Sequence, residues 1–464
     1  MANADVQIQT GETVVVVCLV SGSYTTKSGL CCGSPSIMST VLLQVGQCGN
    51  QLGLEWWRLL MQTPGQGSEN DRCERSRNPF SARDGKLGAV FVDSEPKVLR
   101  GARHLVRSKK LHESNIIAGK GGRGSNWAYG YHGQRDEGEH GILQQTMEAV
   151  RREVERRDCY CGTILLHSLS GGTGSGLGAR LCEEIREEFP VGHILSVSVA
   201  PYQSGESPLQ HYNTLLSLSS LHRSVDGLLL FCNDQALALA KAQPGAPKGP
   251  SAPSCPGSSF SAINAHIASC LAGLLLPVYS ITTASGLSLG MEPWELVRSV
   301  CPLPAAKLLH TSQACSRERT HWNSLASSSL QALPHLSPEG KLHSSRAVLA
   351  VARGVQDDSF LMSTALQRLR RGHRCVPWNP FPIDHWTDPR DHFDCSPSSR
   401  RLTVCSNHSS ASDLLGRVMQ RAGEMIQARA YLHWYQRHGL ETQDFQQALD
   451  ALNTVMQEYN TQMD

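Results

Sequence analysis

Short apolar runs alternate with helix-patterned segments through the first half of the chain. The strand-like runs lie at residues 40–45, 87–93, 162–169, 193–200 and 226–232. Between them, residues 53–61, 179–189 and 209–221 carry apolar side chains at helical spacing. Strands that alternate with helices predict an α/β fold with a parallel sheet and right-handed crossovers.

The pattern is weaker in the second half of the chain. A mostly apolar stretch at 260–276 predicts a buried helix, and residues 346–354 are typical of a strand. Near the end, residues 416–438 are predicted to form one helix that stops at Gly439. Thr442 can then cap a last helix with apolar residues on one face. Two packed helices are therefore expected to close the chain.

Two segments have no such pattern. Residues 241–259 hold five prolines and three glycines, which predicts a surface loop. Residues 1–37 have no helical period, and we predict that they form a disordered N-terminal extension.

Composition narrows the class of protein. A chain of 464 residues has room for two or three compact units. Its 43 Lys and Arg against 41 Asp and Glu give a net charge of +2, which excludes a strong general attraction to nucleic acid or to anionic membranes. The spacings of the 16 cysteines match neither a disulfide-rich framework nor a zinc site. We therefore expect reduced thiols and no metal site formed by cysteines. The apolar run 14–20 is too short to cross a bilayer and a poor signal peptide, which favours the cytosol or the nucleus.

The most informative segment is HSLSGGTGSGLG, in which Ser170 to Gly176 lie between a predicted strand and a helix. Glycines there let backbone N–H groups turn toward one concavity next to a helix N-terminus, so the segment suits phosphate oxygens. It lacks the lysine of a Walker A loop. A loose dinucleotide pattern is also present, but no acid ends the next strand to bind a ribose, which disfavours hydride chemistry. A glycine turn without a ligand is the alternative.

Other segments follow strand ends at the edge where parallel sheets bind ligands. They are GQCGNQLG at 46–53, the carboxylates Asp93 and Glu95, and the glycine-rich residues 119–130. Three anion-friendly glycine loops and two carboxylates suit a phosphate chain with Mg²⁺ held largely through water. Together they favour nucleoside triphosphate binding.

Five motifs, in this order, resemble the tubulin superfamily. They are GQCGNQLG, VDSEPKV, SNWAYG, SGGTGSG and YLHWYQRHGL. SNWAYG, REVERRD and YNTLLSLSSLHRSVDGLLL look closest to the delta-tubulin branch. The resemblance covers roughly residues 38–464. It implies a tubulin fold with a GTP-binding domain at 38–280 on a Rossmann-like parallel sheet, an α/β intermediate domain at 281–410 and a C-terminal helical hairpin at 411–464.

The resemblance also implies a set of site residues. Asp93 and Glu95 would lie near Mg²⁺, and the loop residues Glu206 and Gln210 near the ribose. Asn233 and Asn264 would read guanine, with Phe260 stacking on the base, since an amide offers both a donor and an acceptor to the guanine edge. Residues that would line the nucleotide or cradle its phosphates are Gln47, Cys48, Gly124, Ser125, Ser170, Gly171, Gly172, Thr173, Gly174, Ser175 and Gly176.

Two further positions carry expectations. Ser125 stands where most tubulins have an asparagine, so phosphate affinity is expected to differ. Glu295 falls where alpha-tubulin carries the acid that reaches the next subunit's nucleotide, so it is a candidate catalytic residue acting in trans. Its alternative role is a first-turn acid on a helix opened by Pro293.

The resemblance implies a GTP-binding cytoskeletal subunit of centrioles and basal bodies that supports triplet microtubules and cilium formation. Epsilon-, alpha- and beta-tubulin are the implied partners, without nucleic acid and without membrane insertion. GTP hydrolysis at a subunit interface is an open question. The alternatives are a solitary GTP-switched regulator that does not polymerise and, less favoured, a Rossmann-type oxidoreductase.

One basic cluster is not explained by the nucleotide site. It consists of Arg368, Arg370, Arg371 and Arg374. Such a cluster is typical of a solvated face, with a site for an acidic partner as the alternative.

Overall fold

A computed structural model gives the structure of most of the chain from residue 38 onward. The described residues are 38–62, 80–82, 84–133, 141–157, 159–205, 207–242, 256–278, 280–282, 293–318, 320–355, 359–391 and 398–461. The predicted extension 1–37 lies outside them. So does most of the predicted loop at 241–259, of which 241–242 end one helix and 256–259 begin another.

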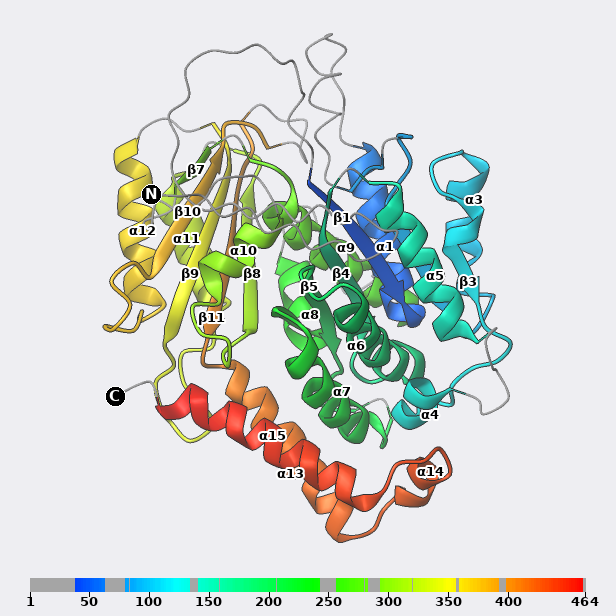
Figure 1. The fold of residues 1–464 in the computed structure, drawn as a ribbon. Helices are drawn as coiled ribbons and strands as arrows, with labels where there is room; N and C mark the ends of the chain where they lie inside the picture. Colours follow the sequence, from blue (N-terminus) through cyan, green and yellow to red (C-terminus); the bar gives the residue numbers. More distant parts are fainter. Residues whose placement is uncertain are drawn as a thin grey trace, which may run out of the picture. The chain divides into compact units, whose positions relative to one another are not determined.

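An eleven-stranded sheet runs through the described residues (Figure 1). Its first six strands are all parallel, in the order β3 (Ile116–Ala118), β2 (Ala89–Asp93), β1 (Met38–Val45), β4 (Cys159–Ser168), β5 (His193–Ala200) and β6 (Gly227–Cys232). The predicted parallel sheet and the α/β fold class are thereby confirmed.

The sheet continues into a mixed half. Its strands follow in the order β8 (Leu308–Ser316), β11 (Arg400–His408), β9 (Ser345–Gly354), β10 (Ile383–Asp388) and β7 (Ser280–Thr282). β8 pairs in parallel with β6, with Leu228 opposite Leu308, whereas β11 is antiparallel to both of its neighbours. The strand predicted at 346–354 is therefore β9. Residues from 37 onward form one compact unit, and the division into domains at 280 and 410 stays a prediction.

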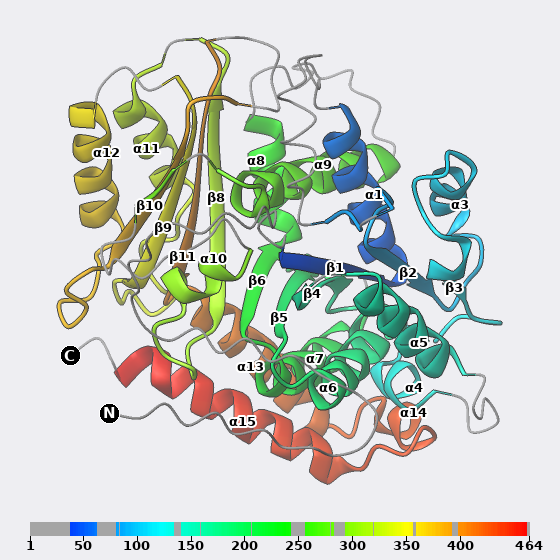
Figure 2. The same ribbon diagram turned by 45° about the horizontal axis from the view of Figure 1, so that its top comes forward.

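Helices cover both faces of the sheet, because alternate strand residues point to opposite sides. In β1, Leu43 faces one core and Leu42 the other. The Leu43 side is covered by α4 (Trp127–His132), α5 (Ile142–Glu155), α6 (Gly178–Glu188), α7 (Gln210–Ser224), α13 (Ala411–Gln427), α14 (Leu432–Gln436) and α15 (Thr442–Thr461). Figures 1 and 2 both show α13 and α15 running along α7.

The Leu42 side is covered by a second set of helices. These are α1 (Gly46–Gln62), α3 (Arg100–Arg107), α8 (Asn233–Ala242), α9 (Pro256–Leu275) and α10 (Pro293–Val300). A third core lies under α11 (Trp322–Gln331) and α12 (Ser359–Gly372), which pack on β8, β9 and β11. Short turns occur at η1 (Glu113–Asn115) and at the π-helix η3 (Thr173–Leu177). Among the described residues, no helix combines the length and the hydropathy needed to cross a membrane.

Two sequence predictions about these helices are wrong. Residues 46–53 were expected to be a loop but form the first two turns of α1. Their glycines allow close packing rather than a flexible backbone, because a Cβ on Gly49 would lie 2.0 Å from the carbonyl oxygen of Leu166. The single helix expected at 416–438 is broken into α13 and α14. Arg429 and Tyr431 have φ of 51° and 59°, and this left-handed backbone ends one helix and turns the chain before the next.

The far end of α9 is fixed by a buried arginine. The guanidinium of Arg353 donates to the carbonyl oxygens of Gly273, Leu276 and Pro277 and pairs with Asp388 at 3.2 Å. These carbonyls are acceptors that the helix itself leaves unpaired, so a cation satisfies them well. The position of α9 is therefore tied to β9 and β10.

Candidate nucleotide-binding site

The carboxyl ends of the parallel strands meet at one edge of the sheet, and the candidate site lies there. The segments that follow β1, β2, β4, β5 and β6 carry most of the predicted site residues. Gln47 and Cys48 lie in the first turn of α1, where Gln47 is exposed and Cys48 half-buried. Glu206, in the segment after β5, lies outside the described residues.

The start of α1 lies directly against the glycine segment after β4. Gly46 has φ of 76°, and a Cβ there would lie 2.8 Å from the backbone nitrogen of Gly174. Both the left-handed backbone and the close approach require glycine at position 46. The structure therefore brings two of the predicted phosphate-binding segments into contact.

The glycines of the segment after β4 have two different surroundings. Cβ atoms on Gly172 and Gly176 would lie 2.8 Å from the backbone oxygen of Arg123 and 2.1 Å from that of Trp127. A Cβ on Gly171 would meet nothing within 4 Å. Gly172 and Gly176 thus let the segment pack against residues 123–130, while Gly171 borders open space. The hydroxyl of Ser170 lies 3.0 Å from that of Ser168, which also accepts from the backbone N–H of Ser170.

Residues 119–126 form the third anion-friendly segment. Gly124 and Ser125 both have left-handed backbone, with φ of 56° and 49°, and both are exposed. Asn126 then caps α4: its side-chain oxygen accepts from the N–H of Tyr129, and its amide donates to the carbonyl of Trp434. The cap therefore connects this segment to the C-terminal helices.

Sequence reasoning missed Asn213, a fully buried residue of α7. Its amide donates to the carbonyls of Ser125 and Ser170, both at 2.7 Å. Its oxygen accepts from the N–H of Trp127 at 2.9 Å and from the Tyr435 hydroxyl at 2.6 Å. All four hydrogen-bonding positions of the amide are used. One side chain thus holds two of the predicted phosphate-binding segments and α14 together.

His167, in β4, hydrogen-bonds to the glycine segment 170–176 that follows this strand. Its Nδ1 donates to the carbonyl of Gly174 at 2.9 Å, because a carbonyl can only accept, and its Nε2 accepts from the hydroxyls of Ser196 and Ser198. Burial lowers the pKa of His167 to about 4, so the ring is neutral near pH 7. Only the neutral ring can provide both the donor and the acceptor that these contacts need.

Asp93 ends β2 and Glu95 follows it, on the side of η3. Ser94 lies between them, and its hydroxyl is 2.7 Å from that of Thr173. Asp93 is buried; its Oδ1 accepts from the N–H of Glu95, while its Oδ2 accepts no hydrogen bond from the described residues. Burial raises the pKa of Asp93 to about 6. Glu95 is more exposed and pairs with Lys97 at 2.8 Å. A buried carboxylate oxygen without a donor fits a site for a divalent cation.

The predicted base-binding residues lie on two packed helices, α8 and α9. Asn233 opens α8 directly after β6, and Asn264 lies on α9; the side chains of both are buried apart from a small exposed fraction. Phe260 is 40% exposed, and its ring centroid is 6.2 Å from that of Tyr202. Gln210 is buried, and its amide donates to the carbonyl of Tyr202.

Glu295 lies apart from these segments, in the first turn of α10. Its carboxylate is buried and accepts from the Arg298 guanidinium at 2.9 Å, three residues along the same helix. The contact is the one expected of a helix-start acid. Its predicted role toward a second subunit stays a prediction.

The sequence of this chain is similar to those of known proteins. Residues 39–241 match the Tubulin/FtsZ family, GTPase domain. The chain is 28% identical to the tubulin delta chain of Homo sapiens and 27% identical to that of Macaca fascicularis, over 91% of this chain and 99% of each relative. It is also 26% identical to the tubulin beta-2 chain of Emericella nidulans, over 90% of this chain and 93% of that relative. The chain is therefore similar to tubulins along most of its length, and its residues 39–241 match the GTPase domain of the Tubulin/FtsZ family.

Proposed function

We propose that this chain is a delta-tubulin-like, GTP-binding subunit of the cytoskeleton that acts at centrioles and basal bodies. The observation that supports the nucleotide site best is the junction at Asn213, where segments 119–126 and 170–176 are held side by side at the carboxyl edge of a parallel sheet. Glycine-rich backbone next to helix N-termini is suited to phosphate oxygens.

Within this proposal, the residues divide by the part of GTP that they contact. Gln47, Cys48 and the glycine segments would face the phosphates. Asn233 and Asn264 would pair with the guanine edge, Phe260 would stack on the base, and Glu206 and Gln210 would lie near the ribose. Asp93, with Glu95 beside it, would hold Mg²⁺ mainly through water, and the ion when bound would neutralise the phosphate charge.

The proposal is tested first by base selectivity. Asn264→Ala is expected to lower GTP affinity by about 1–3 kcal/mol, because the guanine edge loses a buried partner. Isothermal titration with GTP and ATP measures this, and Asn453→Ala on α15 is the control because it changes a half-buried asparagine on a different helix. Equal affinity of the unmodified chain for ATP and GTP would contradict the assignment of the base pocket.

The predicted cation site has its own test. Asp93→Asn is expected to reduce by about tenfold the gain in GTP affinity that Mg²⁺ provides, since an amide replaces the buried carboxylate. Glu95→Gln should have a smaller effect, because that carboxylate is exposed and already paired with Lys97. GTP titrations in excess Mg²⁺ and in EDTA compare the two variants. An unchanged Mg²⁺ effect in Asp93→Asn would show that the ion binds elsewhere.

Assembly with other tubulins is the second part of the proposal, and Glu295 gives its sharpest test. We expect Glu295→Ala to leave GTP binding intact and to slow GTP turnover only where this chain meets a GTP-loaded partner, since a carboxylate can orient the attacking water. Turnover is measured in mixtures with alpha-, beta- or epsilon-tubulin. The same rate with and without the carboxylate would make Glu295 a helix-start acid that pairs with Arg298.

The cellular part of the proposal predicts where the protein is found. A tagged full chain should concentrate at centrioles and basal bodies, and its loss should reduce triplet microtubules and cilium formation. A uniform cytoplasmic distribution, together with GTP turnover that does not depend on protein concentration, would instead indicate a solitary GTP-switched regulator.

A further inference from the structure

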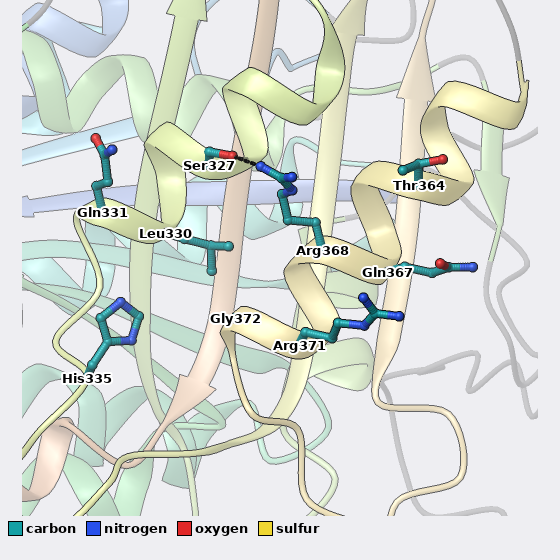
Figure 3. Close-up of a pocket in the computed structure, with 9 residues that line it drawn as sticks. All are labelled: Ser327, Leu330, Gln331, His335, Thr364, Gln367, Arg368, Arg371 and Gly372. Atoms are coloured by element: carbon teal, nitrogen blue, oxygen red, sulfur yellow. Dashed lines mark hydrogen bonds between the residues drawn. The ribbon is translucent and has the colours of Figure 1, made fainter.

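A cavity of about 610 Å³ opens between α11 and α12, on the mixed half of the sheet (Figure 3). Its floor is the contact between Leu330 and Gly372, where a Cβ on the glycine would lie 2.4 Å from the leucine side chain. Hydrophobic residues beneath the two helices fix their positions: Leu325 and Ala326 of α11 and Ala365 and Leu369 of α12 are all buried in the same core. The cavity is therefore a feature of the packed fold.

The cavity is basic, and none of the residues that line it is acidic. Arg368 and Arg371, one turn apart on α12, both contribute to the lining and are exposed. Neither forms an ion pair with another described residue. The sequences of α11 and α12 contain no Asp or Glu at all, whereas α12 carries three arginines between positions 368 and 371.

The arginines are only partly explained by the helix itself. Basic residues in the last turn stabilise a helix dipole, and this accounts for Arg370 and Arg371. It does not account for Arg368, which lies earlier and reaches across the cavity to donate to the hydroxyl of Ser327 on α11 (Figure 3). That contact holds the Arg368 guanidinium over the opening of the cavity, where its other N–H groups can donate to an anion.

The remaining polar groups select the kind of anion. Gln331 and Gln367 offer amides that can pair with both the N–H and the carbonyl of an extended peptide. Two guanidiniums at i and i+3 match two carboxylates on one peptide segment, in charge-assisted and bidentate pairs. No Phe, Tyr or Trp lines the cavity on which a nucleic-acid base could stack, and the net charge of +2 gives no overall attraction to nucleic acid.

We propose that the cavity between α11 and α12 is a binding site for an acidic peptide, with Arg368 and Arg371 receiving its carboxylates. The site is separate from the nucleotide site and does not depend on the function proposed above. Binding by surface electrostatics of this kind weakens as salt rises, which gives a first signature of the interaction.

The test uses the full chain and a fluorescein-labelled peptide of alternating Glu and Gly, with a Gln and Gly peptide as the neutral comparison. Fluorescence anisotropy is measured at low and high salt. The acidic peptide is expected to bind and the neutral peptide to bind at least about tenfold more weakly, because it lacks charge-assisted pairs. Equal binding of the two peptides would overturn the proposal.

Variants locate the site. Arg368→Glu with Arg371→Glu should weaken peptide binding about tenfold or more, whereas Arg103→Glu with Arg107→Glu, the same charge change on exposed positions of α3, should change it less than about twofold. Gln331→Trp, at an exposed position of the lining, fills the cavity without changing charge and should also block binding. An unchanged circular dichroism spectrum and an unchanged urea unfolding midpoint of each variant show that it is folded.

Three further results would overturn the proposal. One is an equal loss of peptide affinity in the α3 variant, which would indicate that the net charge of the whole protein attracts the peptide. Another is undiminished binding to Gln331→Trp when that variant is folded. The third is a single-stranded oligonucleotide of the same charge that binds more tightly than the peptide and loses affinity in the α12 variant, since the site would then recognise nucleic acid.

Discussion

Replacing Asn213 by leucine is expected to remove most of the GTP affinity and about 3–5 kcal/mol of the free energy of unfolding. The substitution leaves two carbonyls, one N–H and one hydroxyl without their partner in a buried region, and each such loss costs about 1–3 kcal/mol where the structure cannot relax. GTP titration and urea unfolding of the same variant measure the two effects.

A graded comparison separates the network from simple loss of packing. Tyr435→Phe removes one hydroxyl from Asn213 and leaves the contacts to Ser125 and Ser170 intact, so it should cost about 1 kcal/mol and change GTP affinity little. If Asn213→Leu bound GTP as tightly as the unmodified chain, other contacts would have to hold the two predicted phosphate-binding segments.

Acid is expected to destabilise the protein steeply, by at least about 4 kcal/mol for each pH unit near pH 5. His167, His266 and His310 have pKa values lowered by burial to about 4, and His373 to about 3, from the usual 6.5. Each is neutral when folded and takes up a proton on unfolding, so stability is lost as the pH falls from 6.5 toward 4. Burial also lowers the pKa of His408, which acts in the same direction. Asp93, with its pKa raised to about 6, acts in the opposite direction and cancels about one of these protons.

Urea unfolding between neutral pH and about pH 5 measures this slope. His373→Gln should flatten it by about 1.4 kcal/mol for each pH unit, the contribution of one proton. His104→Gln, at an exposed position of α3, is the control and should leave the slope unchanged. A slope that is equal in the two variants would show that His373 is not protonated on unfolding in this range.

The sequence was sufficient for the elements whose periodicity is local. The strand predicted at 193–200 coincides with β5. The helix predicted at 209–221 begins one residue before α7. The glycines at 46–53 misled because glycine indicates both flexibility and close packing, and only the neighbouring strand shows which applies. The break at Arg429 and Tyr431 was not predictable, since neither residue type favours left-handed backbone.

The predicted site residues differ in how far topology places them. Asp93 ends a strand, and Ser170 and Asn233 follow strand ends, so their position at one edge of the sheet could be inferred from topology alone. Asn213 gives no such signal. It lies inside an ordinary helical pattern, and its partners Ser125, Ser170 and Tyr435 are 43 to 222 residues away in the chain. Contacts of that kind exist only after folding.

The parallel pairing of β6 with β8 has a consequence for how this protein can be divided. A fragment limited to residues 39–241 would leave β6 as an uncovered edge strand, with Leu228, Leu229 and Leu230 carrying unpaired backbone groups. Such apolar edges recruit strands from other molecules and cause aggregation. A fragment of residues 39–241 is thus expected to aggregate, because β8, the strand that covers the edge of β6, comes from beyond residue 300.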